Sequence, residues 1–339
     1  MRKLKIQIMD RRHFLGGMLA AGGLLFTGHG GLMMASAHES GDDHDQDRSQ
    51  KQEKRRRDRR NGNRSRKGCA DEDTVIFISD FHSNPGGYQS DKLRATVADI
   101  LTMDPLPRSV IAFGDIAYLT GQVAEYRNAR DILAPLEEAG ISLTFGMGNH
   151  DRREEFAEVF PEYASDSLLE GRLVHIVKGK YADIIMLDSL QQGDDRSTWI
   201  TEGALDERQK EWLQTVLDSC SKPVFVAAHH PLSEIGIRKM LLACPSCAGF
   251  IHGHYHKWLT DWDHLNWSSK RLLPILCLPS TGHYGDIGYV VFHMREHEAE
   301  AELVQSDFYF PKVTAQEEYP ALWHRMMEKN RDARFWFTY

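Results

Sequence analysis

The sequence has few cysteines, no internal repeat and no long apolar run. The mildly apolar stretch 16–26 is too short and too rich in glycine for a membrane-spanning helix, which needs about 20 apolar residues. Five cysteines in 339 residues are an odd number, so at least one thiol is free or paired between chains. The residues after position 68 suffice for one α/β domain.

Net positive charge is concentrated at the N-terminal end. The whole chain carries −8, but residues 1–37 and 38–68 each carry +4, which leaves −16 for the remainder. The strong negative charge after residue 68 argues against tight polynucleotide binding and favours small substrates. Residues 38–68 contain almost no apolar side chain, so we expect a disordered charged linker. Its basic run 54–67 is either a solvated spacer or a weak contact for anionic surfaces.

Residues 1–37 resemble a bacterial twin-arginine signal peptide. Arg11 and Arg12 precede the apolar stretch, and Ala35-Ser36-Ala37 supplies the small residues of a cleavage site. The resemblance implies the twin-arginine export machinery as a partner, a mature chain starting near His38 and a periplasmic or secreted location. A retained amphipathic anchor is the alternative.

Cys244 and Cys247 flank Pro245 and Ser246 in a short segment. Outside the cytoplasm they would form a local disulfide or remain two free thiols. Partners for a structural zinc site are not evident, and the βαβ context of a thioredoxin-like redox motif is missing.

Metal-binding side chains follow five apolar runs. The runs 75–78, 110–113, 141–145, 224–226 and 249–251 are typical of buried strands. In open α/β sheets, functional groups gather beyond the carboxyl ends of strands. The candidate ligands after these runs are Asp80, His82, Asp115, Asn149, His229, His254 and His256, and His150 and Asp151 follow Asn149 directly.

These side chains offer nitrogen and oxygen ligands and no thiolate. Imidazole suits zinc and iron, and carboxylate or amide oxygens suit manganese, so the set favours Mn, Fe or Zn. One carboxylate can bridge two ions about 3.5–4 Å apart, which clamps a phosphoryl group and lowers the pKa of a bound water toward ~7. Asp115 is the candidate bridge, and the set predicts a hydrolytic site with two metal ions.

The ordered motifs resemble the calcineurin-like metallophosphoesterase superfamily over about residues 74–295. The resemblance implies two ligand sets that share Asp115: Asp80, His82 and His256 complete the first, and Asn149, His229 and His254 complete the second. It also implies that His150 lies over the substrate, as an acid or a transition-state donor, and that Asp151 orients it. The Val-x-x-His form of the motif favours His229 over His230 as the ligand.

Weaker features resemble the class III cyclic-nucleotide phosphodiesterases, including Leu187-Asp188-Ser189 and His229-His230-Pro231. Arg153 is either a phosphate clamp, since its fork geometry suits anions, or an exposed helix residue. His283 is a further candidate for a phosphate contact. Tyr118 resembles the iron-binding tyrosine of purple acid phosphatases; those enzymes typically have Gly at the position of His82, so we expect Tyr118 not to ligate and retain it as a candidate substrate contact.

Helical and strand-like segments alternate between the motifs. Residues 205–220 place Asp206 and Gln209 in capping-box spacing before an apolar face, and 91–103 and 124–139 are similar. The runs 272–278, 288–293 and 300–304 predict strands that close a second sheet. The resemblance implies an α/β fold, a four-layer α-β-β-α sandwich of two mixed sheets over 69–310, with the metal site at the strand ends. We expect 311–339 to form a helix and a strap packed on it.

Together these features predict an exported phosphoesterase with two metal ions. A metal-bridging hydroxide would attack the phosphorus of a small phosphodiester in line while His150 assists departure of the alcohol. The alternative enzyme is a phosphomonoesterase or nucleotidase. A catalytically silent scaffold is less favoured, because silent members generally lose ligands and this set is complete.

Overall fold

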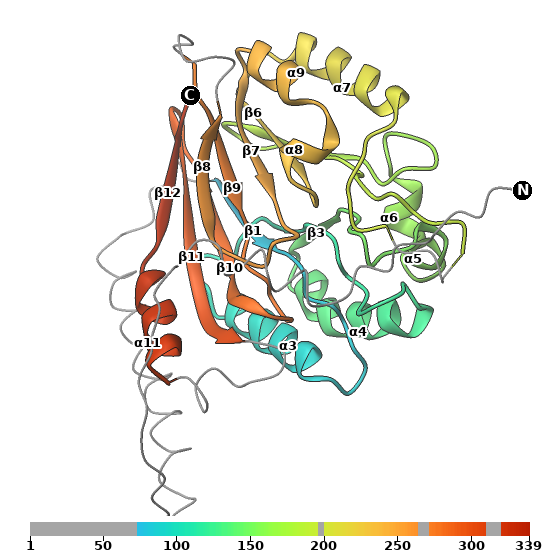
Figure 1. Ribbon diagram of the computed structural model, residues 1–339, viewed down its shortest axis with the longest axis vertical. Helices are drawn as coiled ribbons and strands as arrows, with labels where there is room; N and C mark the ends of the chain where they lie inside the picture. The colour runs from blue at the N-terminus through green and yellow to red at the C-terminus, as the bar shows by residue number, and fades with distance from the viewer. Residues whose placement is uncertain (1–72, 196–199, 264–270, 310–319) are drawn as a thin grey trace, which may run out of the picture. The chain divides into compact units, whose positions relative to one another are not determined.

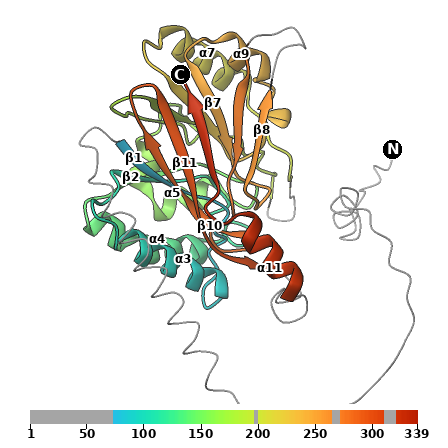
Figure 2. The ribbon, with the colours of Figure 1, turned by 90° about the vertical axis from the view of Figure 1, so that its left-hand side faces the viewer.

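The computed structural model describes residues 73–195, 200–263, 271–309 and 320–339. They form two six-stranded mixed sheets with helices on the outer faces (Figures 1 and 2). The predicted signal peptide and charged linker, residues 1–68, lie outside the described residues. Within the described ranges, no helix has the length and apolar character needed to span a membrane.

The first sheet has the strand order β12-β11-β10-β1-β2-β3. Its parallel half contains β1 (Asp73–Ile78), β2 (Ser109–Ala112) and β3 (Ser142–Phe145). The chain crosses between these strands through α3 (Tyr88–Ile100) and α4 (Val123–Glu138), and α5 (Arg153–Val159) and α6 (Pro161–Ser165) follow β3. Its antiparallel half contains β10 (Gly285–Met294), β11 (Glu298–Tyr309) and β12 (Arg334–Thr338).

The second sheet has the order β4-β5-β6-β7-β9-β8. Four parallel strands form its centre: β5 (Asp183–Met186), β6 (Val224–Ala228), β7 (Cys247–His252) and β9 (Leu273–Cys277). The antiparallel edges are β4 (His175–Val177) and β8 (Leu259–Asp263). The helices of this half are α7 (Glu207–Ser219), α8 (Leu232–Ile235) and α9 (Arg238–Ala243).

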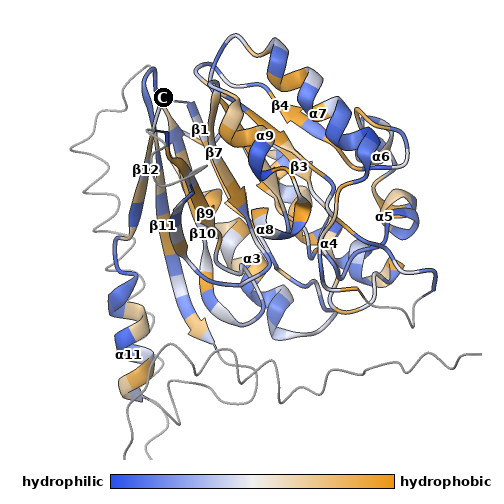
Figure 3. Cartoon of the chain, turned by 45° about the horizontal axis from the view of Figure 1, so that its top comes forward, coloured by the Kyte–Doolittle hydropathy of each residue, from blue (hydrophilic) through white to orange (hydrophobic). Residues whose placement is uncertain are grey.

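Three apolar cores separate the four layers. Val75 and Phe77 of β1 face the core between the sheets, whereas Ile76 and Ile78 face the core beneath α3 and α4, because successive side chains of a strand point to opposite faces. A third core lies between the second sheet and α7 and α9. Figure 3 shows mostly apolar residues along central strands such as β7 and a mixture of polar and apolar residues along the outer helices. The predicted α-β-β-α sandwich is confirmed.

The predicted helices are present, with one difference in capping. Residues 91–103, 124–139 and 205–220 correspond to α3, α4 and α7. Asp206 caps α7 and accepts a hydrogen bond from the backbone N of Gln209 at 2.8 Å. The Gln209 side chain does not return to the cap; it bonds the backbone N and O of Asp188, both at 2.9 Å. The helix therefore fixes the loop after β5.

The prediction that the late strands all close the second sheet was wrong. β9 joins that sheet, but β10 pairs with β1 and β11 pairs with β10 in the first sheet. The edge of β1 opposite β2 needs a partner, and the almost entirely buried β10 supplies it. Apolar patterning indicates a buried strand but does not identify the neighbour with which it pairs.

The first sheet also extends beyond residue 310, where the predicted domain ends. α11 (Pro320–Lys329) lies beside β11, and β12 forms the outer strand (Figure 1). Phe337 of β12 is fully buried, with its ring centroid 5.1 Å from that of Phe225 and 5.7 Å from that of Phe292. The expected strap is therefore a sheet strand that contributes to the core.

Cys244 and Cys247 are free thiols. The structure thus adopts the second of the two alternatives predicted for this pair. Burial raises the pKa of Cys247 to about 12, so its thiol stays protonated and unreactive at neutral pH. Cys69 lies outside the described residues.

Candidate metal centre

The candidate ligands meet at the carboxyl ends of strands from both sheets. β1 leads to Asp80 and His82, β2 to Asp115, and β3 to Asn149. β6 leads to His229, and β7 leads to His254 and His256. The candidate ligands therefore lie at strand ends, as predicted, and the structure shows that both sheets supply them.

Backbone strain is concentrated in these ligand loops. The described residues include six non-glycine residues with positive φ, and five of them are candidate ligands: Asp80 (51°), His82 (45°), Asp115 (49°), His254 (69°) and His256 (55°). Non-glycine residues in this region cost free energy and persist where surrounding contacts enforce them. Here the Asp80 N–H donates to Gly114 O at 3.1 Å and the His82 N–H to Asp115 O at 3.0 Å, which ties two ligand loops together.

Two glycines allow the ligand loops to pass close to one another. A Cβ atom on Gly148 would lie 2.3 Å from Asp115 Oδ1, and one on Gly253 would lie 2.1 Å from Ser79 Oγ. Both distances are shorter than van der Waals contact, so the two Gly residues are required by the approach of the loops to the carboxylates.

The first ligand group consists of Asp80, His82, Asp115 and His256, all buried. His256 Nε2 lies 3.1 Å from Asp80 Oδ1, and His82 Nε2 lies 3.5 Å from Asp115 Oδ2. One ligand atom from each of the four residues lies within 4.8 Å of the others. This set is the same as the first set implied by the family resemblance.

The second ligand group lies on the other side of Asp115. His229 Nε2 is 3.4 Å from Asp115 Oδ2 and 3.3 Å from Asn149 Oδ1, and His254 Nδ1 is 3.0 Å from the same Asn149 oxygen. Asp115 Oδ2 therefore faces imidazoles of both groups. Its Oδ1 accepts from the backbone N of His150 at 2.8 Å, so Oδ2 is the oxygen placed to bridge.

Backbone carbonyls fix the histidine tautomers. The Nδ1 atoms of His82, His229 and His256 lie 3.1, 3.0 and 3.2 Å from the carbonyl oxygens of Tyr118, Phe113 and Tyr284. A carbonyl oxygen can only accept, so each Nδ1 carries a proton and each ring, when neutral, presents its Nε2 lone pair to the centre. The donor set, with oriented imidazoles, two carboxylates and one amide, fits two divalent or trivalent ions.

The electrostatics of the centre favour a bound cation. Burial opposes ionisation of Asp80 and Asp115, but His256 and His229, respectively, hold the pKa of each carboxyl well below its usual range. Burial also disfavours the charged form of His229, but Asp115 and Asp80 outweigh it and raise its pKa to about 9. The metal-free centre thus holds a proton on His229, where a metal ion would take its place.

His150 lies beside the bridge. Its Nδ1 is 3.1 Å from Leu119 O, its Nε2 is 4.0 Å from Asp115 Oδ2, and its side chain is 13% exposed. His150 is thus more accessible than His82 and His229, the other imidazoles next to the buried Asp115.

Asp151 does not have the role predicted for it. Its carboxylate accepts from the backbone N–H groups of Ile116, Ala117 and Gly148 at 2.9–3.3 Å and from the Tyr126 hydroxyl at 3.2 Å. The carbonyl of Leu119, rather than Asp151, contacts the ring nitrogen of His150. Asp151 instead joins the loops after β2 and β3.

Arg153 is mostly buried and so is not an exposed helix residue, and its role as a phosphate clamp stays a prediction. Its guanidinium makes two bonds to Asp188, at 2.7 and 2.8 Å, and a third to Leu190 O at 2.8 Å. Asp188 is almost fully buried. Two nitrogens of the guanidinium therefore bind the loop after β5.

His283 and Tyr118 lie beside the first ligand group. The ring centroid of His283 is 4.5 Å from that of His82, and its Nδ1 is 3.2 Å from the Tyr88 hydroxyl. Burial lowers the pKa of His283 to about 3, so this imidazole is neutral. Tyr118 contributes its carbonyl to His82, and its ring packs at 5.8 Å against His283. Their positions leave both as candidates for substrate contact.

A recess opens beside His150. Its lining comes from the loops around 119–120, 149–152 and 190–193, together with Ile200. The guanidinium of Arg152, in this lining, bonds Gly193 O at 3.3 Å and Asp195 O. The segment 190–193 was missed by the sequence analysis; the Leu187-Asp188-Ser189 motif just before it was the available signal.

Comparison with known proteins identifies the family. The family model for calcineurin-like phosphoesterases matches residues 74–258, more than half of the chain. The chain belongs to the calcineurin-like phosphoesterase family. The ligand set described above lies within the matched range.

Two similar relatives carry the name "probable cyclic nucleotide phosphodiesterase". The one from Rhodopseudomonas palustris is 32% identical over 153 residues, 44% of this chain and 52% of the relative. The one from Psychrobacter arcticus is 30% identical over 106 residues, 29% of this chain and 35% of the relative. The matches thus span about half or less of the length of these relatives.

Among solved structures, a dimetal phosphatase from Danio rerio is similar with a TM-score of 0.54 and 14% sequence identity. The match covers 68% of this chain and 95% of that protein. At this identity the similarity shows the fold, which agrees with the sandwich described above.

Proposed function

We propose that this protein is an exported phosphodiesterase that uses two metal ions to hydrolyse small phosphodiesters. The observation that carries the proposal is the position of Asp115 Oδ2, 3.5 and 3.4 Å from imidazoles of the two ligand groups and 4.0 Å from His150 Nε2. Two ion sites and a proton-transfer group thus share one carboxylate.

The two ligand groups would hold Mn, Fe or Zn ions. When bound, such a pair activates water for attack and neutralises charge on a phosphoryl group. The protein's own part is to orient the ligands: carbonyls direct the three Nε2 atoms inward, and Asp151 holds the loops after β2 and β3 in contact.

His150 would pass a proton to the departing alcohol. Its Nδ1 is engaged by Leu119 O, so Nε2 is the atom that faces the centre. Burial lowers the pKa of His150 in the metal-free protein. An anionic ester next to the ring would favour the protonated form again, because opposite charges raise the pKa of an imidazole.

Two observations favour a diester over a monoester. Two similar relatives are named as probable cyclic nucleotide phosphodiesterases. A second ester substituent would lie against the recess beside His150, where Leu119, Leu190 and Ile200 provide apolar lining beside the glutamines. Among possible diesters, the net charge of −16 after residue 68 disfavours polynucleotides and leaves small ones. A phosphomonoesterase remains the alternative outcome of the test.

Export is supported by the twin-arginine pattern at Arg11 and Arg12 and by Ala35-Ser36-Ala37. We expect the protein recovered from the periplasm to begin near His38, as read by N-terminal sequencing. Replacing both arginines by Lys should retain the uncleaved chain inside the cell. A cleaved, exported double variant would refute the twin-arginine route.

The first test of the activity compares two nitrophenyl esters. The metal-loaded protein should hydrolyse bis(4-nitrophenyl) phosphate faster than 4-nitrophenyl phosphate, and chelation should abolish both reactions. A monoester preference would assign a phosphatase, and no hydrolysis with Mn, Fe or Zn would indicate a silent scaffold.

Two variants test the assigned roles. Asp115→Asn should lose bound metal and activity together. His150→Ala should keep its metal and lose roughly 10²–10⁴-fold in kcat, the usual contribution of a general acid. Unchanged hydrolysis in both variants would exclude this mechanism.

A further inference from the structure

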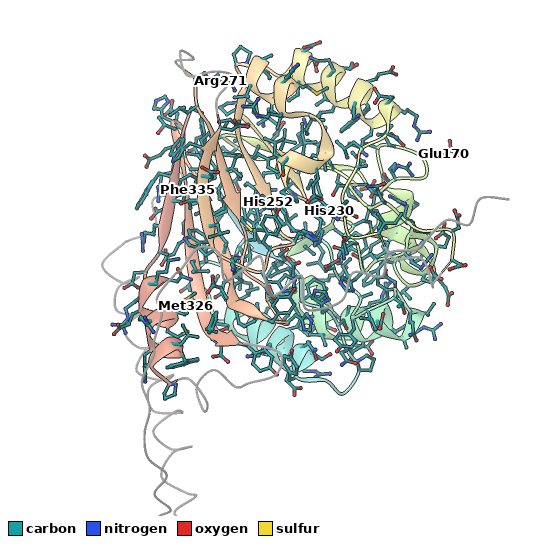
Figure 4. All side chains as sticks on the ribbon, viewed as in Figure 1. Glu170, His230, His252, Arg271, Met326 and Phe335 are labelled. Atoms are coloured by element: carbon teal, nitrogen blue, oxygen red, sulfur yellow. The ribbon has the colours of Figure 1, made fainter. Side chains whose placement is uncertain are left out.

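His230, the residue after the ligand His229, has one ring nitrogen without a partner. The side chain is fully buried, and Figure 4 shows it in the interior of the fold. Its Nδ1 lies 2.8 Å from Ser189 Oγ. Its Nε2 has no hydrogen-bond partner among the described residues. A buried polar atom without a partner costs free energy, so it invites a functional explanation.

Ser189 determines which nitrogen of His230 carries the proton. The Ser189 oxygen already accepts from the backbone N of His230 at 3.3 Å. Among the described residues, the acceptor found for the hydroxyl proton is Nδ1 of His230. Nδ1 therefore accepts, and the proton of the neutral ring is on Nε2.

His229 and His230 consequently have opposite tautomers. The Nδ1 of His229 faces the carbonyl of Phe113, which leaves a lone pair on Nε2 for a metal ion. The Nε2 of His230 presents a hydrogen instead and cannot ligate in this tautomer. Both rings border the second ligand group, because one ligand atom each of His229, His230 and His254 lies within 4.8 Å of the others.

The His230 ring is held firmly in place. A Cβ atom on Gly203 would lie 2.3 Å from His230 Cγ, so that backbone packs directly on the ring. Ser189 follows Asp188, which is fixed by Arg153 and Gln209. The direction of the Nε2–H group is thus set before any ligand arrives, as expected for a preorganised donor.

We propose that the Nε2–H group of His230 donates a hydrogen bond to a phosphoryl oxygen of the ester bound at the second ligand group. The proposal rests on the proposed function and makes His230 a substrate-binding donor rather than a fifth histidine ligand. An anionic oxygen is the partner that the buried N–H lacks, and bonds to charged acceptors are the stronger ones.

The test measures binding without turnover. Full-length protein loaded with Mn or Zn is prepared as wild type, His230→Ala, His230→Gln and His175→Gln. His175 is the matched control, because it is also buried with an unpartnered Nε2 but lies in β4, away from the ligands. Elemental analysis gives the ions per chain, and calorimetry gives the Kd for inorganic phosphate.

We expect all four proteins to hold the same number of ions. The Kd for phosphate should rise roughly 10-fold or more in His230→Ala, in line with loss of one hydrogen bond to a charged acceptor. It should rise less in His230→Gln, whose amide N–H approximates the position of Nε2, and should not change in His175→Gln. Loss of an ion from His230→Ala, or unchanged phosphate affinity in that variant, would overturn the proposal.

The tautomer itself provides a test that needs no variant. Imidazole ¹⁵N spectra of the zinc-loaded wild-type protein should show Nε2–H for His230 and Nδ1–H for His229, whose Nε2 would then bind the ion. An Nδ1–H tautomer at His230 would refute the donor role even if the variants fail to fold. Absence of phosphodiester hydrolysis would refute the proposed function, but it would not alter the expected tautomer or phosphate affinity.

Discussion

At the scale of single residues, a proton on His229 would compete with a metal ion for the second ligand group. The carboxylates of Asp115 and Asp80 raise the pKa of His229 to about 9, despite burial, which lowers it. Below that pH the imidazole must lose a proton before it can ligate. We therefore expect the affinity of the second ligand group for metal to increase with pH up to about 9, with up to one proton released from His229 when that ion binds at neutral pH.

Calorimetric titration of the metal-free protein in buffers of different ionisation enthalpy measures that proton release. His254 serves as an internal contrast, because burial lowers its pKa to about 4 and it therefore has no proton to lose at pH 7. An affinity that stays constant between pH 7 and pH 9 would contradict the assignment of His229 as a protonated ligand.

A second prediction concerns the ion pair between Arg153 and Asp188. The carboxylate of Asp188 is fully buried, whereas the Arg153 side chain is 18% exposed. Arg153→Leu would leave a buried charge without its partner, and we expect a loss of about 3–5 kcal/mol in the free energy of unfolding. Urea denaturation of the two proteins measures the difference.

The control is the surface pair of Arg127 and Glu158, whose side chains are more than half exposed. Arg127→Ala should cost at most about 1 kcal/mol, since water already screens this pair. Equal losses in the two variants would mean that the Arg153 pair is not the internal support described above.

The clustering of the candidate metal ligands was predictable from sequence because each one follows an apolar run in a short motif. The roles of Asp151 and Arg153 were not, because they depend on partners far along the chain: Asp151 accepts from Ile116 and Ala117, and Arg153 binds Asp188. A carboxylate or a guanidinium in a motif shows which interactions the residue can make, but only the fold shows which groups it binds.

At the scale of elements, the contact between the loops after β2 and β3 determines the position of Asp115, the candidate bridging carboxylate. Gly148 lies where a Cβ atom would come within 2.3 Å of Asp115 Oδ1. We expect Gly148→Ala to displace this carboxylate and to weaken binding of both ions, because Asp115 belongs to both ligand groups. The number of ions retained after dialysis against a weak chelator measures the effect.

Gly140, which lies between α4 and β3, is the matched control. Its φ is +81° and an added Cβ would meet no atom within 4 Å, so Gly140→Ala should lower stability by about 1–2 kcal/mol without loss of metal. Equal metal retention in Gly148→Ala and Gly140→Ala would contradict the proposed loop contact.

Periodicity in the sequence identified the helices and strands better than it identified their neighbours. α7 was predictable because an acidic cap precedes an amphipathic face, and both signals are local. The pairing of β10 with β1 was not predictable, because the edge that β10 covers belongs to a strand about 200 residues earlier. Such pairing is decided by which unpaired edge is available after the rest of the sheet has formed.

At the scale of the whole molecule, the two sheets depend on a residue close to the C-terminus. Phe337 is fully buried, and its ring packs against those of Phe225 in the second sheet and Phe292 in the first. Gly249 of β7 makes room for it, since a Cβ atom there would lie 2.7 Å from the Phe337 ring. β12 therefore joins the two sheets through the core between them.

Phe337→Ala should consequently destabilise the entire fold by about 3–5 kcal/mol, the range for removing a buried Phe ring. The neighbouring Trp336 is 48% exposed, and Trp336→Ala should change stability far less, by roughly 0.5 kcal/mol. Both values come from urea unfolding of the metal-loaded protein. If the C-terminal segment were only a strap on a complete domain, both variants would have the same free energy of unfolding as the wild type. A large loss of this free energy in Phe337→Ala alone would establish that the domain is not complete without β12.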